Sequence, residues 1–90
     1  MIYLSSRQNV SDYAKWRTAF DTNATFRKDA GATGVNQIYR DVENPGTVTA
    51  IMEWNNIEKA RTFSADPKLK EVMGKAGVIG SPEVRFFNHA

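Results

Sequence analysis

The sequence predicts an α+β domain of the ferredoxin-like type, with element order β-α-β-β-α-β and a four-stranded antiparallel sheet whose helices cover one face. Three observations predict it. Residues 13–30 contain neither Gly nor Pro and are long enough for a helix. The turn at residues 43–46 separates two strand-like segments and marks a hairpin. A second helical region then precedes a final β-rich segment, and this order folds into one sheet by the split βαβ rule.

The 90 residues are expected to form one domain, because a chain of this length builds only one hydrophobic core. The apolar fraction is 41%, and there is no cysteine to form a disulfide. A small, aromatic-rich domain without such cross-links often gains stability by burying a face against a second copy of itself.

The first strand and the first helix follow from local signals. Residues 1–7 alternate loosely and favour a strand. Asn9 or Ser11 can cap the next helix, because their side chains accept hydrogen bonds from free helical N–H groups. This helix is predicted over residues 13–30, and Gly31 provides its left-handed stop.

The hairpin and the third helical segment come next. Residues 35–42 and 47–54 are rich in β-branched and aromatic residues and predict two strands. Asn55 or Asn56 then caps a helix whose inner positions include Ala60.

A further helix starts at Asp66-Pro67, an N-cap residue followed by proline at the first helical position. Gly77 ends this helix, and residues 83–89 predict the last strand. Its buried stripe has the spacing i, i+3, i+4, i+7 and consists of Leu69, Val72, Met73 and Ala76.

Apolar residues occur on both sides of the strand at residues 47–54. Met52 and Trp54 lie on one side, and Ile51 lies on the other. Helices cover only one face of the sheet, so the other face needs a cover of its own. We therefore expect a homodimer in which two sheets face each other around a two-fold axis. The alternative is a monomer with scattered exposed apolar residues, which is also common.

Charge and composition exclude several function classes. Twelve Lys and Arg are interspersed with ten Asp and Glu, giving a net charge of +2 without a basic run, which argues against nucleic-acid binding. The N-terminal residues do not resemble a signal peptide, and no apolar stretch approaches a membrane span, so we expect a cytoplasmic protein. One histidine and no cysteine make a dedicated metal site unexpected.

A family resemblance is carried by Asp12–Arg17 with Phe20-Asp21, Gly31–Gly34, Met52–Trp54, Phe63–Pro67 and Ala76–Val78. Together these segments resemble the dimeric α+β barrel superfamily, close to its antibiotic biosynthesis monooxygenase-like and cyclase proteins. The resemblance covers essentially the whole chain and implies a homodimer. Superfamily members include cofactor-independent oxygenases, isomerases, heme-degrading enzymes and proteins without a known role.

Two branches of the superfamily imply different chemistry. Heme-degrading members need a histidine on a helix, whereas His89 lies at the end of the last predicted strand, so no heme or other cofactor is expected. Similar cofactor-free oxygenases hold phenolic polyketides with Asn, Tyr and Trp side chains. The resemblance therefore implies binding of a small aromatic or polyketide-like molecule, by a cofactor-independent monooxygenase, cyclase or isomerase. The alternative is a non-catalytic ligand-binding or structural dimer.

Two polar residues, Asn23 and Arg27, interrupt the apolar side of the first predicted helix. At 100° per residue, this side contains Tyr13, Trp16, Ala19, Phe20, Ala24, Phe26 and Ala30. Burying an arginine is costly unless the charge is paired or hydrated. One interpretation is that Arg27 reaches solvent or pairs with Glu53 or Asp41. The other is a pocket in which Arg27 and Asn23 face an anionic or carbonyl-bearing ligand.

The predicted ligand-binding residues are Asn23, Arg27, Trp16, Tyr39 and Trp54. No catalytic residue is assigned. His89 and Glu53 have the chemistry of a general base, but a frayed terminus and a paired or exposed carboxylate explain them as well. The sequence thus leaves open whether the chain is an enzyme.

Overall fold

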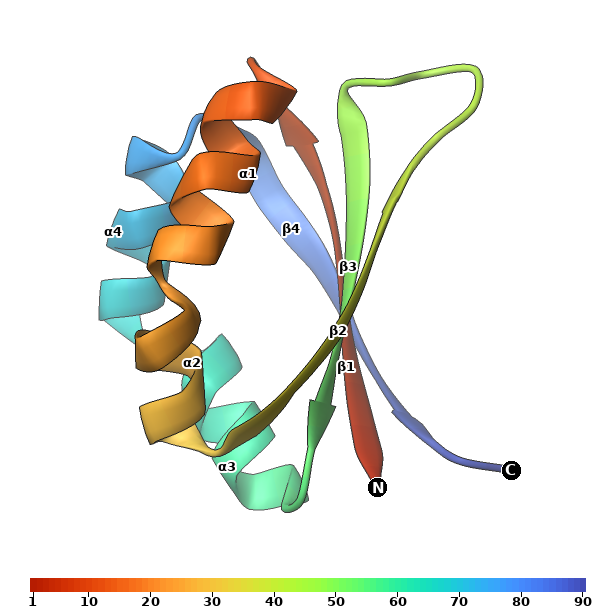
Figure 1. Ribbon diagram of the computed structural model, residues 1–90, viewed down its shortest axis with the longest axis vertical. Coiled ribbons are helices and arrows are strands. Elements are labelled where there is room, and N and C mark those ends of the chain that lie inside the picture. The colour runs from red at the N-terminus through yellow and green to blue at the C-terminus, as the bar shows by residue number, and fades with distance from the viewer.

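The computed structural model describes residues 1–90 and has the predicted ferredoxin-like α+β architecture (Figure 1). The antiparallel sheet has strand order β2-β3-β1-β4, and the helices lie against one face, called here the inner face. No helix is long and apolar enough to cross a membrane. The elements are β1 (Ile2–Val10), α1 (Tyr13–Thr22), α2 (Ala24–Ala30), β2 (Ala32–Arg40), β3 (Thr47–Trp54), α3 (Ile57–Ser64), α4 (Pro67–Lys75) and β4 (Val78–Asn88).

The first strand is longer than predicted. β1 continues to Val10 because it pairs with β3 on one side and β4 on the other. Asn9 is therefore part of the strand and does not cap the helix. The N-cap is Asp12, whose Oδ1 accepts a hydrogen bond from the backbone N–H of Lys15 at 3.3 Å. The expected caps, Asn9 and Ser11, were wrong, because pairing on both sides extends the strand beyond its local signal.

The predicted helix over residues 13–30 is interrupted at Asn23. The side-chain Nδ2 of Asn23 donates to the carbonyl of Ala19 at 2.7 Å, and the backbone N–H of Asn23 donates to the same oxygen at 3.0 Å. An Asn side chain that competes for a helical carbonyl weakens the regular ladder. α1 consequently ends at Thr22, and α2 ends as predicted before Gly31, which has a φ of 123°.

Both edge strands begin earlier than predicted. β2 starts at Ala32, which pairs with Trp54 of β3. The register then shifts between Ala32 and Asn36, in a stretch that contains Gly34 with a φ of 94°. β4 starts at Val78 and also changes register beside β1. Such bulges add residues to one strand while the ladder continues.

The helices of the second half begin as predicted. Asn56 caps α3 by accepting from the N–H of Lys59 at 3.1 Å. Asp66 caps α4 by accepting from the N–H of Lys68 at 2.9 Å, with Pro67 at the first helical position. The predicted stripe of α4 is only half-buried apart from Ala76. Leu69, Val72 and Met73 face a cavity between the helices and the sheet, which leaves them incompletely buried.

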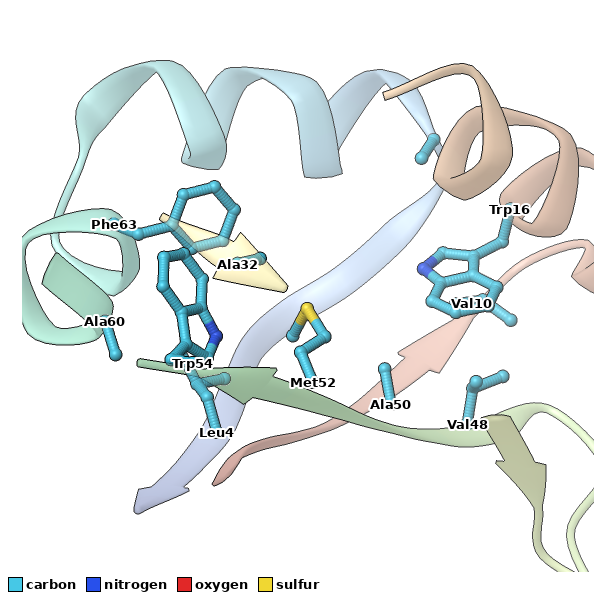
Figure 2. Packing of buried hydrophobic residues seen from close by; sticks show 11 residues of the cluster. Leu4, Val10, Trp16, Ala32, Val48, Ala50, Met52, Trp54, Ala60 and Phe63 are labelled. Atoms are coloured by element: carbon cyan, nitrogen blue, oxygen red, sulfur yellow. The ribbon is translucent and has the colours of Figure 1, made fainter. Parts of the chain in front are cut away.

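The core is divided between the two ends of the inner face. At one end Trp54 packs on Phe63, with 5.1 Å between ring centroids, and at the other end Trp16 stands near Val10 and Val48 (Figure 2). Smaller or flexible side chains, Ala50 and Met52, lie between the two groups in the same view. The buried hydrophobic residues are Leu4, Val10, Trp16, Ala32, Val48, Ala50, Met52, Trp54, Ala60, Phe63 and Ala76.

Candidate functional site

A cavity of about 670 Å³ lies between the helix layer and the inner face of the sheet. Its floor includes the directly paired Ser6 and Ala50, whose short side chains leave space between the two aromatic ends of the core. Residues of α1, α2, α4 and β4 also line it, which is why α4 is incompletely buried. This volume lies in the range of sites for drug-sized molecules.

A row of stacked side chains forms one side of the helix layer. Tyr13 stacks on Trp16 at 6.1 Å and Trp16 stacks on Phe20 at 5.1 Å between ring centroids. Spacings of three and four residues bring these rings together on one helix face. An arginine stands over each end of the row: Arg40 over Tyr13 at 4.2 Å and Arg27 over Phe20 at 3.6 Å. Of these five side chains, Trp16, Phe20 and Arg27 line the cavity.

Arg27 is the charged group of the site, and only 6% of its surface is exposed. Its Nη1 donates to the backbone carbonyl of Phe20 at 2.6 Å. Phe20 lies in the last turn of α1, where backbone carbonyls lack N–H partners within the helix and can accept a hydrogen bond from a side chain. No carboxylate lies within ion-pair distance of Arg27. Asp41 pairs instead with Arg7, and Glu53 accepts from a threonine hydroxyl.

Burial lowers the pKa of the Arg27 guanidinium, while the charge of Asp21 raises it and that of Arg17 lowers it to a smaller extent. A guanidinium has so high an ordinary pKa that it stays protonated at neutral pH. The helix layer therefore presents a positive charge to the cavity. One carbonyl and one aromatic face satisfy it in part, and a guanidinium has five N–H donors.

The structure brings three of the predicted site residues together: Asn23, Arg27 and Trp16 line the cavity. Tyr39 lies on the outer face, because it pairs with Thr49 in a position that points away from the helices. Trp54 is on the inner face but fully buried beyond the cavity. Its ring packs on Phe63, and its Nε1 has no hydrogen-bond partner.

Sequence reasoning missed Ser6 and Gln8, which line the cavity from β1 and are 7% and 6% exposed. The Nε2 of Gln8 donates to the Oγ of Ser6 at 3.4 Å, and the Oε1 of Gln8 is buried without a partner. The signal was present in the alternation of Leu4, Ser6, Gln8 and Val10. For Gln8 it was lost because the strand was predicted to end at Arg7, and the face of Ser6 within the predicted strand was not assigned.

The two candidates for a general base, His89 and Glu53, do not line the cavity. His89 is exposed at the end of the chain, and its Nδ1 is 3.1 Å from the carbonyl of Ala90. Glu53 accepts a hydrogen bond from Thr33 at 2.9 Å on the outer face. No group of three His, Asp or Glu side chains has an arrangement able to hold a metal ion.

No protein-family model and no curated protein matches the chain in sequence. Solved structures do match it in fold. A proposed antibiotic biosynthesis monooxygenase from Bordetella bronchiseptica superposes with a TM-score of 0.82 at 15% identity, over 99% of this chain and 96% of that one. SnoaB, a cofactor-independent oxygenase from Streptomyces nogalater, has a TM-score of 0.75 at 17% identity, over 99% and 92%.

A third structure, a proposed antibiotic biosynthesis monooxygenase from Deinococcus radiodurans, has a TM-score of 0.70 at 16% identity, over 100% of this chain and 93% of that one. At such identities the likeness concerns the fold. The chain thus has the fold of the antibiotic biosynthesis monooxygenase-like proteins, as its sequence segments suggested.

Proposed function

We propose that the cavity binds a small, planar aromatic molecule, of polyketide-like character, through an anionic or carbonyl oxygen held by Arg27. The observation that carries this proposal is a buried guanidinium at the cavity wall without a carboxylate partner. A buried charge is stable only with partners, and an oxyanion of the ligand supplies the strongest one.

The rest of the lining supports an aromatic ligand. Trp16 and Phe20 contribute aromatic surface to the cavity lining beside Arg27, and Leu4 and Met52 provide apolar contact from the sheet. Sites of this size typically combine an apolar lining with a few polar groups that orient the ligand. Asn23 is the polar neighbour of Arg27 on the same wall.

The activity we propose is cofactor-independent oxygenation of a phenol, supported by the fold shared with SnoaB. A phenolate can transfer an electron to O2, and recombination at the para carbon gives a hydroperoxide that loses water. One phenol and one O2 then give one quinone and one water, so no external reductant is needed. In this reaction Arg27 favours the phenolate form through its charge.

The first test is a calorimetric titration with 2-naphthoate and its uncharged analogue 2-acetylnaphthalene. Hydrogen bonds to a charged group are stronger than neutral ones, so 2-naphthoate is expected to bind about 10-fold more tightly than 2-acetylnaphthalene. Equal affinities, or no binding of either compound, would contradict the proposed oxyanion site.

Oxygen uptake with 1,5-dihydroxynaphthalene separates catalysis from simple binding. Stoichiometric uptake with formation of 5-hydroxy-1,4-naphthoquinone, above the rate without protein, supports the oxygenase.

The rival function is a non-catalytic ligand-binding dimer, and the small number of ionisable side chains around the cavity favours it. Besides Arg27, the ionisable lining residues are Asp66, which caps α4, and the exposed Lys70. Binding without oxygen uptake would support this rival.

We further propose that the chain is a homodimer through the outer face of its sheet, which no helix covers (Figure 1). Apolar side chains remain exposed on this face at Tyr39 (53%), Phe87 (47%) and Ile79 (58%). Its charges largely cancel in local pairs such as Arg7 with Asp41 at 3.0 Å. A nearly neutral face with exposed apolar groups suits a second copy of itself better than a charged partner.

Replacing Phe87 by aspartate should convert a dimer of twice 10.1 kDa into a monomer, because the interface would then bury an unpaired charge. Light scattering at micromolar concentration measures this. Ala14→Asp is the control, since Ala14 is exposed on the helix layer and should leave the dimer intact. A wild-type protein that scatters as a single chain would contradict the proposed dimer.

A further inference from the structure

The cavity has a second polar region, on its floor, that the proposed function leaves without a role. Ser6 and Gln8 come from adjacent inward positions of β1, whereas Arg27 comes from the opposite wall in the helix layer. The floor around them is apolar and includes Leu4, Ala50 and Met52. Two neighbouring polar side chains at inward positions of a central strand are unusual, because such positions normally face a core.

The hydrogen bonding of this region is incomplete. Gln8 is 94% buried, its amide reaches Ser6 at 3.4 Å, and its Oε1 has no partner. Buried polar groups are nearly always satisfied, so an unpartnered amide on a cavity wall indicates a missing partner.

The neighbouring edge strand provides room for that partner. The register between β1 and β4 shifts between Arg7 and Asn9, so Gln8 has no paired residue in β4. The extra residues of β4 include Gly80, with a φ of 70°, and Pro82, and both line the cavity. In such a bulge the extra residues lie outside the regular ladder, so strand pairing holds no β4 residue directly beside Gln8.

We propose that Ser6 and Gln8 form a subsite for a ligand hydroxyl, on the wall opposite the Arg27 oxyanion site. The inference rests on the proposed function and narrows its ligand class to hydroxylated aromatic anions. A hydroxyl both donates and accepts, so it matches an amide and a serine whichever way the amide is turned. A second anion does not match, because the neutral pair offers it no charge and the Gln8 carbonyl repels it.

Calorimetric titrations with 6-hydroxy-2-naphthoate and 2-naphthoate test the subsite, since the two probes differ only in the hydroxyl. The wild-type protein should bind the hydroxylated probe about 10-fold more tightly, as expected for one hydrogen bond to an otherwise unsatisfied buried group. Gln8→Met should abolish this preference and leave the affinity for 2-naphthoate unchanged. A preference that persists in Gln8→Met would overturn the subsite.

Ser6→Ala provides a second variant should Gln8→Met fail to fold, and it should also reduce the preference. Ser5→Ala is its matched control, because Ser5 pairs with Ile51 on the outer face and should leave the preference intact. Equal binding of both probes by the wild type, with loss of both on removal of Arg27, would refute the subsite and leave the proposed function standing. Binding of neither probe would refute the proposed function as well.

Discussion

Replacing Arg27 by methionine is expected to weaken the binding of 2-naphthoate by about 100-fold, because it removes the charged hydrogen bonds that hold the carboxylate. The apolar stem of methionine keeps the contact with Phe20, over which the guanidinium now lies at 3.6 Å. Calorimetric titration at neutral pH measures the loss. Arg17→Met is the matched control, since Arg17 is exposed on α1 and pairs with Asp21 outside the cavity.

The stability of Arg27→Met separates the two interpretations of this arginine. Breaking a buried ion pair typically costs about 3–5 kcal/mol, because the remaining charge is left uncompensated. Arg27 has no carboxylate partner, so removing it leaves no unpaired charge behind. The variant also avoids the cost of burying the guanidinium, the same burial that lowers the pKa of Arg27. The free energy of unfolding should therefore stay unchanged or rise. A loss of several kcal/mol would show that Arg27 is structural.

Replacing Trp54 by alanine should lower the free energy of unfolding by about 3–5 kcal/mol, the usual cost of removing a large buried aromatic side chain. Trp54 is fully buried and packs on Phe63 at 5.1 Å, where it closes one end of the core (Figure 2). Denaturant unfolding of the variant and the wild type, compared at the same protein concentration, measures the difference.

Trp54→Phe is the informative companion. It retains most of the aromatic contact and removes an indole N–H that is buried without a partner, so it should cost far less than alanine. A severe loss in Trp54→Phe would mean that the indole N–H has a partner in solution, such as a buried water. A nearly unchanged free energy of unfolding in Trp54→Ala would contradict the role of Trp54 in packing the core.

The sequence determined the elements whose signals are local. The strand at residues 47–54 and the Asp66-Pro67 start of α4 were predicted where they occur, and the Asn56 cap is one of the two caps predicted for α3. Each depends on a few neighbouring residues, such as an Asx side chain over free N–H groups, and needs no tertiary contact. The order of these elements was sufficient to predict the fold, because connection rules leave few topologies for it.

The inward direction of Arg27 and Asn23 was also predictable, since helical periodicity fixes which residues share a face. The break at Asn23 leaves this face in place, because Arg27 still follows Asn23 by one helical turn, with its N–H on the Asn23 carbonyl at 3.2 Å. Both residues therefore line the cavity with Trp16.

Only the tertiary structure decided which strand residues reach the cavity. Successive strand residues face opposite sides, so the face of Tyr39 depends on the register of β2 against β3, which the sequence does not encode locally. Trp54 has the inner face but lies beyond the cavity, under Phe63. Gln8 joined the strand only because pairing on both sides extends β1 to Val10, and this pairing also sets Ser6 on the inner face. Strand length and register arise from long-range pairing, whereas helix faces and caps arise from near neighbours, and this difference separates what the sequence alone decided from what required the folded chain.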